Sequence, residues 1–209
     1  MKVCIFTRSI FKLGGTKRVI TMVANEMAKE HEVTLVTFDD PELENRKMYG
    51  LGENIQVEFV DSSQYKDNKF SVGGLFRTAC KVLNNWTGIF DRGSGEFIKY
   101  LFYPKHVRKR YIEFFNSKDY DVIITTAGLI LLLAAISKDV KAKTVGWQHN
   151  CFDAYVNQQS TLFWKKNSFL RTYIPKMDRF VVLNHYDADE YKKQMDIDCT
   201  VIGNARSFV

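Results

Sequence analysis

The sequence lacks the features of several large protein classes. Its longest uninterrupted apolar run covers the eight residues 129–136, whereas a helix needs about 20 apolar residues to cross a bilayer. No basic segment followed by an apolar segment precedes the first predicted strand, so we expect no secretory signal. The four cysteines, Cys4, Cys80, Cys151 and Cys199, include no C-x-x-C pair. We therefore expect reduced thiols in a cytosolic protein, without disulfides or a zinc site.

Two common nucleotide-binding motifs are also missing. The sequence contains neither G-x-G-x-x-G nor G-x-x-x-x-G-K-[ST], so it predicts neither a dinucleotide fingerprint nor a P-loop. What is present is the composition of an ordinary globular protein, with 45% hydrophobic and 26% charged residues in a chain of 209. This length suits one good core, or one domain of a larger enzyme.

The charge is basic and concentrated in one region. The net charge is +6, and residues 66–118 hold eleven Lys or Arg against four acidic residues. Such an excess favours anionic partners, which are phosphate-bearing substrates, phospholipids or nucleic acids. Nucleic acid ranks last and we expect none, because no helix-turn-helix, zinc-finger or RNP signature accompanies the charge.

The first forty residues predict one βαβ unit. The apolar run Met1–Thr7 is typical of a buried strand, and the polar loop after it ends in Gly14 and Gly15. Apolar residues then recur at helical spacing after Thr16, which we expect to be the N-cap, and His31–Phe38 is a second strand pattern. Units of this kind place ligands at the carboxyl ends of their strands.

The Gly14-Gly15 turn has two interpretations. Residues without Cβ let a ligand approach the main chain, and the helix that follows offers free N–H groups to a phosphate. Alternatively, the pair is only a tight turn between strand and helix. These residues alone leave both interpretations open.

Strand and helix patterns alternate along the rest of the chain. Strands are predicted at 55–60, 121–126, 142–147, 177–183 and 198–202, and helices at 75–86, 97–116, 128–138, 152–174 and 187–195. We expect Pro104 to divide the second of these helices and the long fourth one to be broken. The alternation predicts an α/β protein with a mainly parallel sheet and helices on both faces.

The segment Phe97–Asn116 mixes aromatic and basic residues. It contains seven aromatic residues and a basic cluster that we define as Lys105, Arg108, Lys109 and Arg110. One interpretation is a surface that lies on an anionic membrane. A second is a groove for a lipid-linked or polyanionic acceptor. A third is a pair of amphipathic helices with their aromatic residues packed inward and their basic side in solvent.

His149 is the second candidate for chemistry. It lies in the turn Gln148-His149-Asn150, directly after the predicted strand 142–147. At a strand end it could bond a sugar hydroxyl or assist a proton transfer. A loop histidine can equally be a structural residue.

Several segments resemble a known family. The run GGTKRVITMVANEMAKEHEVTLVTF is similar to the amino-terminal signature of family-four retaining nucleotide-sugar glycosyltransferases, which have the two-domain GT-B architecture. PKMDRFVVLNHYDADEYKK and VIGNA resemble later family motifs. The chain departs from these motifs in two places, where Leu183-Asn184 replaces the usual Ser or Thr and Gly203 replaces Pro.

The resemblance implies roles for individual residues. His149 would be the catalytic histidine that contacts the donor sugar. Gly14, Gly15, Thr16 and Asn150 would bind the donor, with the two glycines beside its phosphates. The basic cluster would form the acceptor or membrane surface. The family implies no metal and no cofactor, because a nucleoside diphosphate sugar is the substrate.

The resemblance also implies a domain organisation and a function. Residues 1–204 would be the Rossmann-like acceptor-side domain, and 205–209 would begin a hinge to a carboxy-terminal donor domain, which carries an E-x7-E pair that this chain lacks. The enzyme would transfer a sugar, with retention, to an envelope polysaccharide or lipid-linked acceptor. We expect it in the cytoplasm, at the inner face of the membrane, and the fragment alone to be inactive. The alternative is a non-catalytic module that binds membranes or polyanions, or a subunit of a split glycosyltransferase.

Overall fold

A seven-stranded parallel sheet forms the centre of the protein. The computed structural model describes residues 1–159 and 161–204, so the expected hinge at 205–209 lies outside the described residues. The strand order is β3-β2-β1-β4-β5-β6-β7, and every neighbouring pair is parallel. The strands are β1 (Lys2–Thr7), β2 (Glu32–Thr37), β3 (Gln56–Phe59), β4 (Val122–Thr126), β5 (Lys143–Trp147), β6 (Arg179–Val182) and β7 (Thr200–Val201). The predicted α/β class is confirmed.

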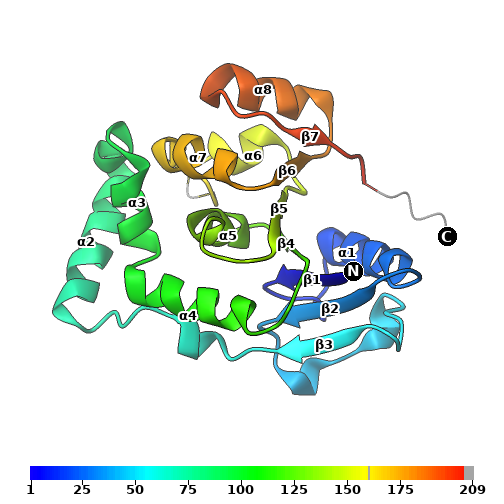
Figure 1. Cartoon of the computed structure of the whole chain (residues 1–209). Helices are drawn as coiled ribbons and strands as arrows, with labels where there is room; N and C mark the ends of the chain where they lie inside the picture. The colour runs from blue at the N-terminus through cyan, green and yellow to red at the C-terminus, as the bar shows by residue number, and fades with distance from the viewer. Residues whose placement is uncertain (160, 205–209) are drawn as a thin grey trace.

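Helices connect the strands and cover the sheet (Figure 1). The α-helices are α1 (Gly15–Met27), α2 (Val72–Thr87), α3 (Gly95–Phe102), α4 (Lys105–Asn116), α5 (Leu129–Ile136), α6 (Phe152–Val156), α7 (Asn167–Tyr173) and α8 (His185–Met195). Five 3-10 turns complete the connections: η1 (Pro41–Leu43), η2 (Arg46–Met48), η3 (Ser62–Tyr65), η4 (Ile89–Arg92) and η5 (Ile174–Lys176). Figure 1 places α2 at the outer edge of the molecule, on the side away from α1, and α2 packs against α3 and η4.

The two faces of the sheet carry separate apolar cores, because successive side chains of a strand point to opposite faces. On one face, Val3 and Ile5 of β1 pack with α1. On the other face, Cys4 and Phe6 pack in the larger core with α4, α5, α7 and α8. Every residue of α5 is buried, as its continuous apolar sequence predicts.

Local expectations are confirmed at two breaks and corrected at one helix start. Pro104 separates α3 from α4, and the region 152–174 is broken into α6, α7 and the start of η5. The predicted N-cap at Thr16 is wrong. Gly14 is the N-cap, and the helix begins at Gly15, so Thr16 already lies in the first helical turn.

No disulfide joins any two cysteines among the described residues. Cys4, Cys80, Cys151 and Cys199 are all free thiols. Burial raises the pKa of the Cys199 thiol to about 12, which keeps it protonated.

Within the described part of the chain, none of the helices has the length and apolar content needed to cross a bilayer.

Candidate functional site

A buried carboxylate holds the loop between β1 and α1 in place. Oδ2 of Asp39, just after β2, accepts hydrogen bonds from the main-chain N–H groups of Ile10 (2.6 Å) and Phe11 (3.0 Å), and from Thr37 Oγ1 (3.2 Å). Burial alone would raise the pKa of Asp39, but these hydrogen bonds outweigh it and lower the pKa below its usual value. Asp39 therefore stays ionised and fixes the path that leads to Gly14.

The Gly14-Gly15 turn presents a free helix N-terminus. The Gly14 N–H donates to Tyr49 Oη at 2.8 Å, which anchors the turn. No acceptor among the described residues takes the N–H groups of Gly15 or Thr16. A Cβ added at Gly15 would meet no atom within 4 Å. The chain's own packing therefore does not require glycine at position 15, and there is open space for a ligand to approach the main chain.

The side chain of Gln148 fixes the turn after β5 through hydrogen bonds. This fully buried side chain donates from Nε2 to the Asn150 carbonyl at 2.8 Å and accepts from Tyr191 Oη at 2.5 Å. The Asn150 side chain accepts from the Cys151 N–H at 3.0 Å. The turn that carries His149 is thus fixed by hydrogen bonds on both sides.

The two candidate regions meet around one pocket. A cavity of about 360 Å³ is lined by Thr16, His149 and Asn150 together with residues of α6 and the loop after it, which are Ala154, Tyr155, Thr161 and Leu162. Gly14 and Gly15 come directly before Thr16 but do not line the cavity. The structure therefore brings the predicted catalytic residue His149 together with two of the four predicted donor-binding residues, Thr16 and Asn150, from segments more than 130 positions apart in the sequence. We call this cavity the His149 pocket.

His149 is held as a neutral imidazole. Its ring packs on Trp147 with the ring centroids 4.0 Å apart. Burial lowers the pKa of His149 to about 4, and the nearby Asn204 side chain opposes this shift only partly. Among the described residues, neither ring nitrogen has a partner at hydrogen-bonding geometry, and both are shielded from solvent. The residue as a whole is half-buried but both nitrogens are covered, so the ring must turn toward the cavity before it bonds a ligand, and at neutral pH it does so without charge.

A second pocket lies at the carboxyl ends of β1 to β4. Its volume is about 440 Å³, and it combines four cations, Arg8, Lys66, Lys69 and Lys81, with a largely aromatic wall. Among the described residues, Asp67 is the one carboxylate that lines it. We call it the cationic pocket. The wall is formed by Phe38, Tyr65, Phe102, Tyr103, Val107, Tyr111, Leu129 and Leu132.

The charge of this pocket is mostly uncompensated. Asp67 forms an ion pair with Arg77, which lies outside the pocket lining and donates to both carboxylate oxygens at 2.8 and 2.7 Å. Burial lowers the pKa of Lys81, and Asp67 opposes that shift. Within residues 1–159 and 161–204, none of the four pocket cations forms an ion pair. The pocket therefore suits an anion bound next to an apolar or ring-shaped group.

The two pockets adjoin at Gly128, which follows β4. A Cβ added there would lie 3.2 Å from Leu162 Cδ2 of the His149 pocket and 3.3 Å from Arg8 Nη2 of the cationic pocket. A side chain at position 128 would crowd a wall residue of each pocket. Groups bound in the two pockets would therefore lie on either side of this glycine.

The basic cluster is only partly free. Arg108 donates to the Tyr103 carbonyl at 3.0 Å, and Arg110 donates to the Gln64 carbonyl at 2.7 Å. Lys109 lies 3.6 Å from Glu113 in an exposed ion pair. Most aromatic residues of the same stretch pack inward, whereas Tyr100 is exposed. None of the four cluster residues lines either pocket.

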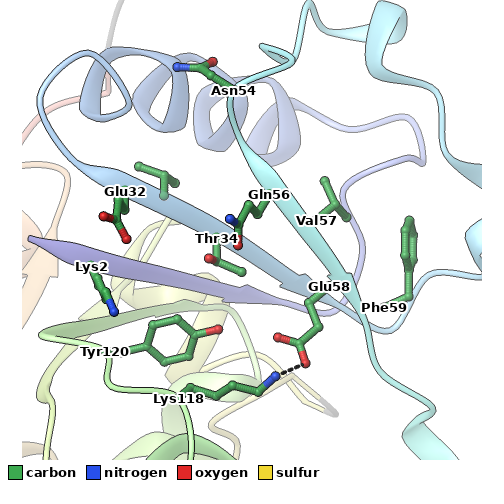
Figure 2. Close-up of a pocket in the computed structure, with 11 residues that line it drawn as sticks. Lys2, Glu32, Thr34, Asn54, Gln56, Val57, Glu58, Phe59, Lys118 and Tyr120 are labelled. Atoms are coloured by element: carbon green, nitrogen blue, oxygen red, sulfur yellow. Dashed lines mark hydrogen bonds and ion pairs between the residues drawn. The ribbon is translucent and has the colours of Figure 1, made fainter.

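Another hollow lies away from this site. Figure 2 shows it, at the amino-terminal ends of β1 and β2 and along β3, with a volume of about 710 Å³. Its charged residues are balanced in number, since Lys2 and Lys118 line it together with Glu32 and Glu58, and Lys118 pairs with Glu58 at 2.7 Å. Parallel sheets bind ligands at the opposite, carboxyl ends of their strands. We therefore assign no part of the site to this hollow.

Asn184, which replaces the usual Ser or Thr, has a clear structural role. Its Oδ1 caps α8 by accepting the Asp187 N–H at 2.8 Å, and its Nδ2 donates to the Asp187 carboxylate at 2.9 Å. The buried Asp187 in turn accepts the Phe152 N–H at 2.7 Å. Asn184 thus helps to fix α6, which borders the His149 pocket.

The cationic pocket was missed from the sequence. Arg8 and Gly128 do follow predicted strands, which could have marked them as edge residues. Lys66, Lys69 and Lys81 carried no such signal, because a loop and a helix bring them to the edge only in the folded chain.

Comparison with known proteins shows which family model matches the chain and which solved structures resemble it. A model of the family described as Glycosyltransferase Family 4 matches residues 13–206. No curated protein matches the chain. The solved structure of Anabaena Alr3699/HepE, in complex with UDP and glucose, is 11% identical with a TM-score of 0.58, over 99% of this chain and 45% of that one. Glycyrrhiza uralensis UGT73P12, complexed with glycyrrhetinic acid 3-O-monoglucuronide, is 10% identical with a TM-score of 0.48, over 96% and 48%.

The chain spans about half the length of these solved structures. At such low sequence identities the similarity shows a shared fold alone. We base that conclusion on the Anabaena structure, whose TM-score is 0.58. Its fold agrees with the sheet described above over nearly the whole chain.

Proposed function

The chain belongs to glycosyltransferase family 4, and from this membership we propose that it is the acceptor-side domain of a retaining enzyme. Its Rossmann-like sheet is one half of the GT-B architecture. The enzyme transfers a sugar from a nucleoside diphosphate sugar to an envelope polysaccharide or lipid-linked acceptor. The observation that carries this proposal is the pair of adjoining pockets at the carboxyl edge of the sheet.

The His149 pocket takes the donor side of the reaction. The free N–H groups of Gly15 and Thr16 suit the donor phosphates, since a helix N-terminus attracts anions. Neutral His149 and Asn150 suit hydroxyls of the transferred sugar. The Anabaena protein was solved with UDP and glucose, which supports a donor of this chemical class. The rest of the donor site belongs to a carboxy-terminal donor domain.

The cationic pocket takes the acceptor. Sugar rings stack on aromatic side chains, and its unpaired cations suit a phosphate or diphosphate, as in a lipid-linked glycan. The acceptor hydroxyl then meets the donor sugar across Gly128. Such an acceptor places the enzyme in the cytoplasm, at the inner face of the membrane, with the basic cluster available for further contact.

A substitution at His149 in the complete enzyme tests the proposal. We expect His149→Ala to lower turnover by a factor of about 10² to 10⁴, because a positioned hydrogen bond to the reacting sugar is lost. The pH profile of the unmodified enzyme should show no ionisation of His149 between about pH 5 and 8, since its pKa is about 4.

The measurement is radiolabelled sugar transfer, with urea unfolding of each variant as a check on stability. Activity within a few-fold of the unmodified enzyme would remove His149 from the site. Loss of folding would make it a structural residue instead.

A further inference from the structure

Helix α2 exposes most of its apolar side chains and buries polar ones, which is the reverse of an ordinary surface helix. Its buried positions are Gly74, Arg77, Cys80 and Asn84. Three of its exposed positions are polar (Thr78, Asn85 and Thr87), and the other seven are apolar: Val72, Leu75, Phe76, Ala79, Val82, Leu83 and Trp86. We call these seven exposed residues the α2 face. A surface helix of a globular protein normally buries its apolar side.

Hydrogen bonds hold α2 in this orientation. Arg77 is bonded to both oxygens of Asp67, and its guanidinium lies 5.5 Å from the centre of the Tyr100 ring. Asn84 donates to the Lys165 carbonyl at 2.8 Å and accepts from the Phe90 N–H at 3.1 Å. Rotating the helix would bury its apolar side chains but leave Arg77 and Asn84 without hydrogen-bond partners. The free energy gained by that burial would have to exceed the cost of losing these hydrogen bonds.

The main chain imposes the same orientation. A Cβ at Gly74 would lie 1.9 Å from the Asn68 carbonyl oxygen, so the helix touches the preceding loop directly at this glycine. At the other end, Trp164 Nε1 donates to the Asn85 carbonyl at 3.1 Å, and Lys165 Nζ donates to the Trp86 carbonyl. The exposure of the α2 face is therefore built into the fold.

The exposure is large and continues beyond the helix. Trp86 is 81% exposed and Val72 is 88% exposed. Phe70 before the helix is 92% exposed, and Ile89 after it is 51% exposed. A contiguous apolar surface of this kind marks a site that something covers. It lies along a helix at the outer edge of the molecule (Figure 1).

The charge around α2 identifies what covers it. The sequence contains no acidic residue between Asp67 and Asp91, while Lys69 and Lys81 are cations. Lys66 and Lys69 are exposed just before the helix. Apolar and Trp side chains on an outer helix, flanked by cations and free of carboxylates, match the chemistry of an anionic bilayer interface.

We propose that the α2 face docks this protein on an anionic lipid bilayer. The apolar side chains enter the boundary between headgroups and acyl chains, and the exposed Lys66 and Lys69 contact lipid phosphates. The contact itself stands apart from sugar transfer. Only its use rests on the proposed function, because Lys66, Lys69 and Lys81 also line the cationic pocket, so docking brings that pocket to a lipid-linked acceptor.

Vesicle co-sedimentation tests the docking. The probes are vesicles of phosphatidylcholine alone and of phosphatidylcholine mixed with phosphatidylglycerol. We expect the unmodified chain to bind the mixed vesicles more tightly, and this preference to shrink as salt screens the charges. Phe76→Ser/Val82→Ser should weaken binding by at least about tenfold, because two side chains no longer leave water on docking.

A matched control uses exposed apolar residues elsewhere. Leu13 and Leu43 are 83% and 47% exposed, against 54% and 66% for Phe76 and Val82. Leu13→Ser/Leu43→Ser should bind vesicles as the unmodified chain does. The urea midpoints of both double variants should stay close to that of the unmodified chain, since all four side chains are exposed. If the α2 double variant does not fold, the single change Trp86→Ser replaces it and should also weaken binding.

Three results would overturn the proposal. The first is no sedimentation of the unmodified chain with mixed vesicles at low salt. The second is equal binding by the unmodified chain and the α2 variant, which would place the contact on another surface such as the basic cluster. The third is a dimer in sedimentation velocity that the α2 variant converts to a monomer, which would make a second copy the occupant of the face.

Discussion

Asp39 offers a sharp test of how the site is supported. It accepts three hydrogen bonds on one oxygen, two of them from the main chain of the loop that leads to Gly14. Asp39→Ala leaves the N–H groups of Ile10 and Phe11 without their partner, at about 1–3 kcal/mol each. We therefore expect the free energy of unfolding to fall by about 2–6 kcal/mol. In a chain of this size, each kcal/mol lowers Tm by about 2–4 °C.

The pH dependence gives an independent check. The folded-state pKa of Asp39 is lowered below its unfolded value. Its contribution is therefore complete above the unfolded pKa of about 3.9 and is lost as the pH falls through the lower, folded value. Asp39→Asn, which keeps the shape but removes the charge, should be less stable than the unmodified chain at neutral pH. That difference should shrink as the pH falls below about 4.

The assay is urea unfolding followed by circular dichroism at several pH values. Asp40→Asn is the matched control, because Asp40 is the exposed neighbour and, within the described part of the chain, its side chain accepts only the Glu42 N–H, at 3.1 Å. Its unfolding midpoint should hardly move. Equal effects of the two Asn variants, or a difference at Asp39 that grows in acid, would refute the reasoning.

Two further predictions concern catalysis. The isolated chain should fold but not transfer sugar or hydrolyse the donor, because the proposed chemistry needs groups from both sides of a two-domain cleft; robust turnover by the purified chain would contradict the two-domain proposal. In the complete enzyme, Gly128→Ala should lower kcat/KM for the acceptor by about tenfold, since the new methyl group crowds Leu162 and Arg8 at the junction of the pockets. Gly93→Ala is its control, because a Cβ there meets only the Phe90 carbonyl oxygen at an ordinary 3.8 Å, and equal losses in the two variants would dismiss the junction.

The sequence by itself determined the α/β class and most of the element order. Strand patterns such as Met1–Thr7 and His31–Phe38, and the break at Pro104, are local signals, because short apolar runs and the geometry of proline act within a few residues. The Gly14-Gly15 turn and the His149 turn were also legible, since the first ends the loop after one predicted strand and the second directly follows another. The rule that parallel strands end at one edge then predicts that such turns lie together.

The side to which a helix turns its apolar residues was decided only by the tertiary structure. Periodicity identifies the apolar stripe of α2 but not the direction it faces, and here the partners of Arg77 and Asn84 turn that stripe to the surface. The helix start at Gly15 was likewise decided by the path of a loop that Asp39 holds from another strand.

The cationic pocket depended on the tertiary structure for the same reason. Lys66, Lys69 and Lys81 join Arg8 only because the chain between β3 and α4 folds back over the carboxyl edge of the sheet. Contacts between residues distant in sequence depend on how helices pack and which buried polar groups find partners. Local sequence patterns predict neither the packing of the helices nor the partners of the buried polar groups.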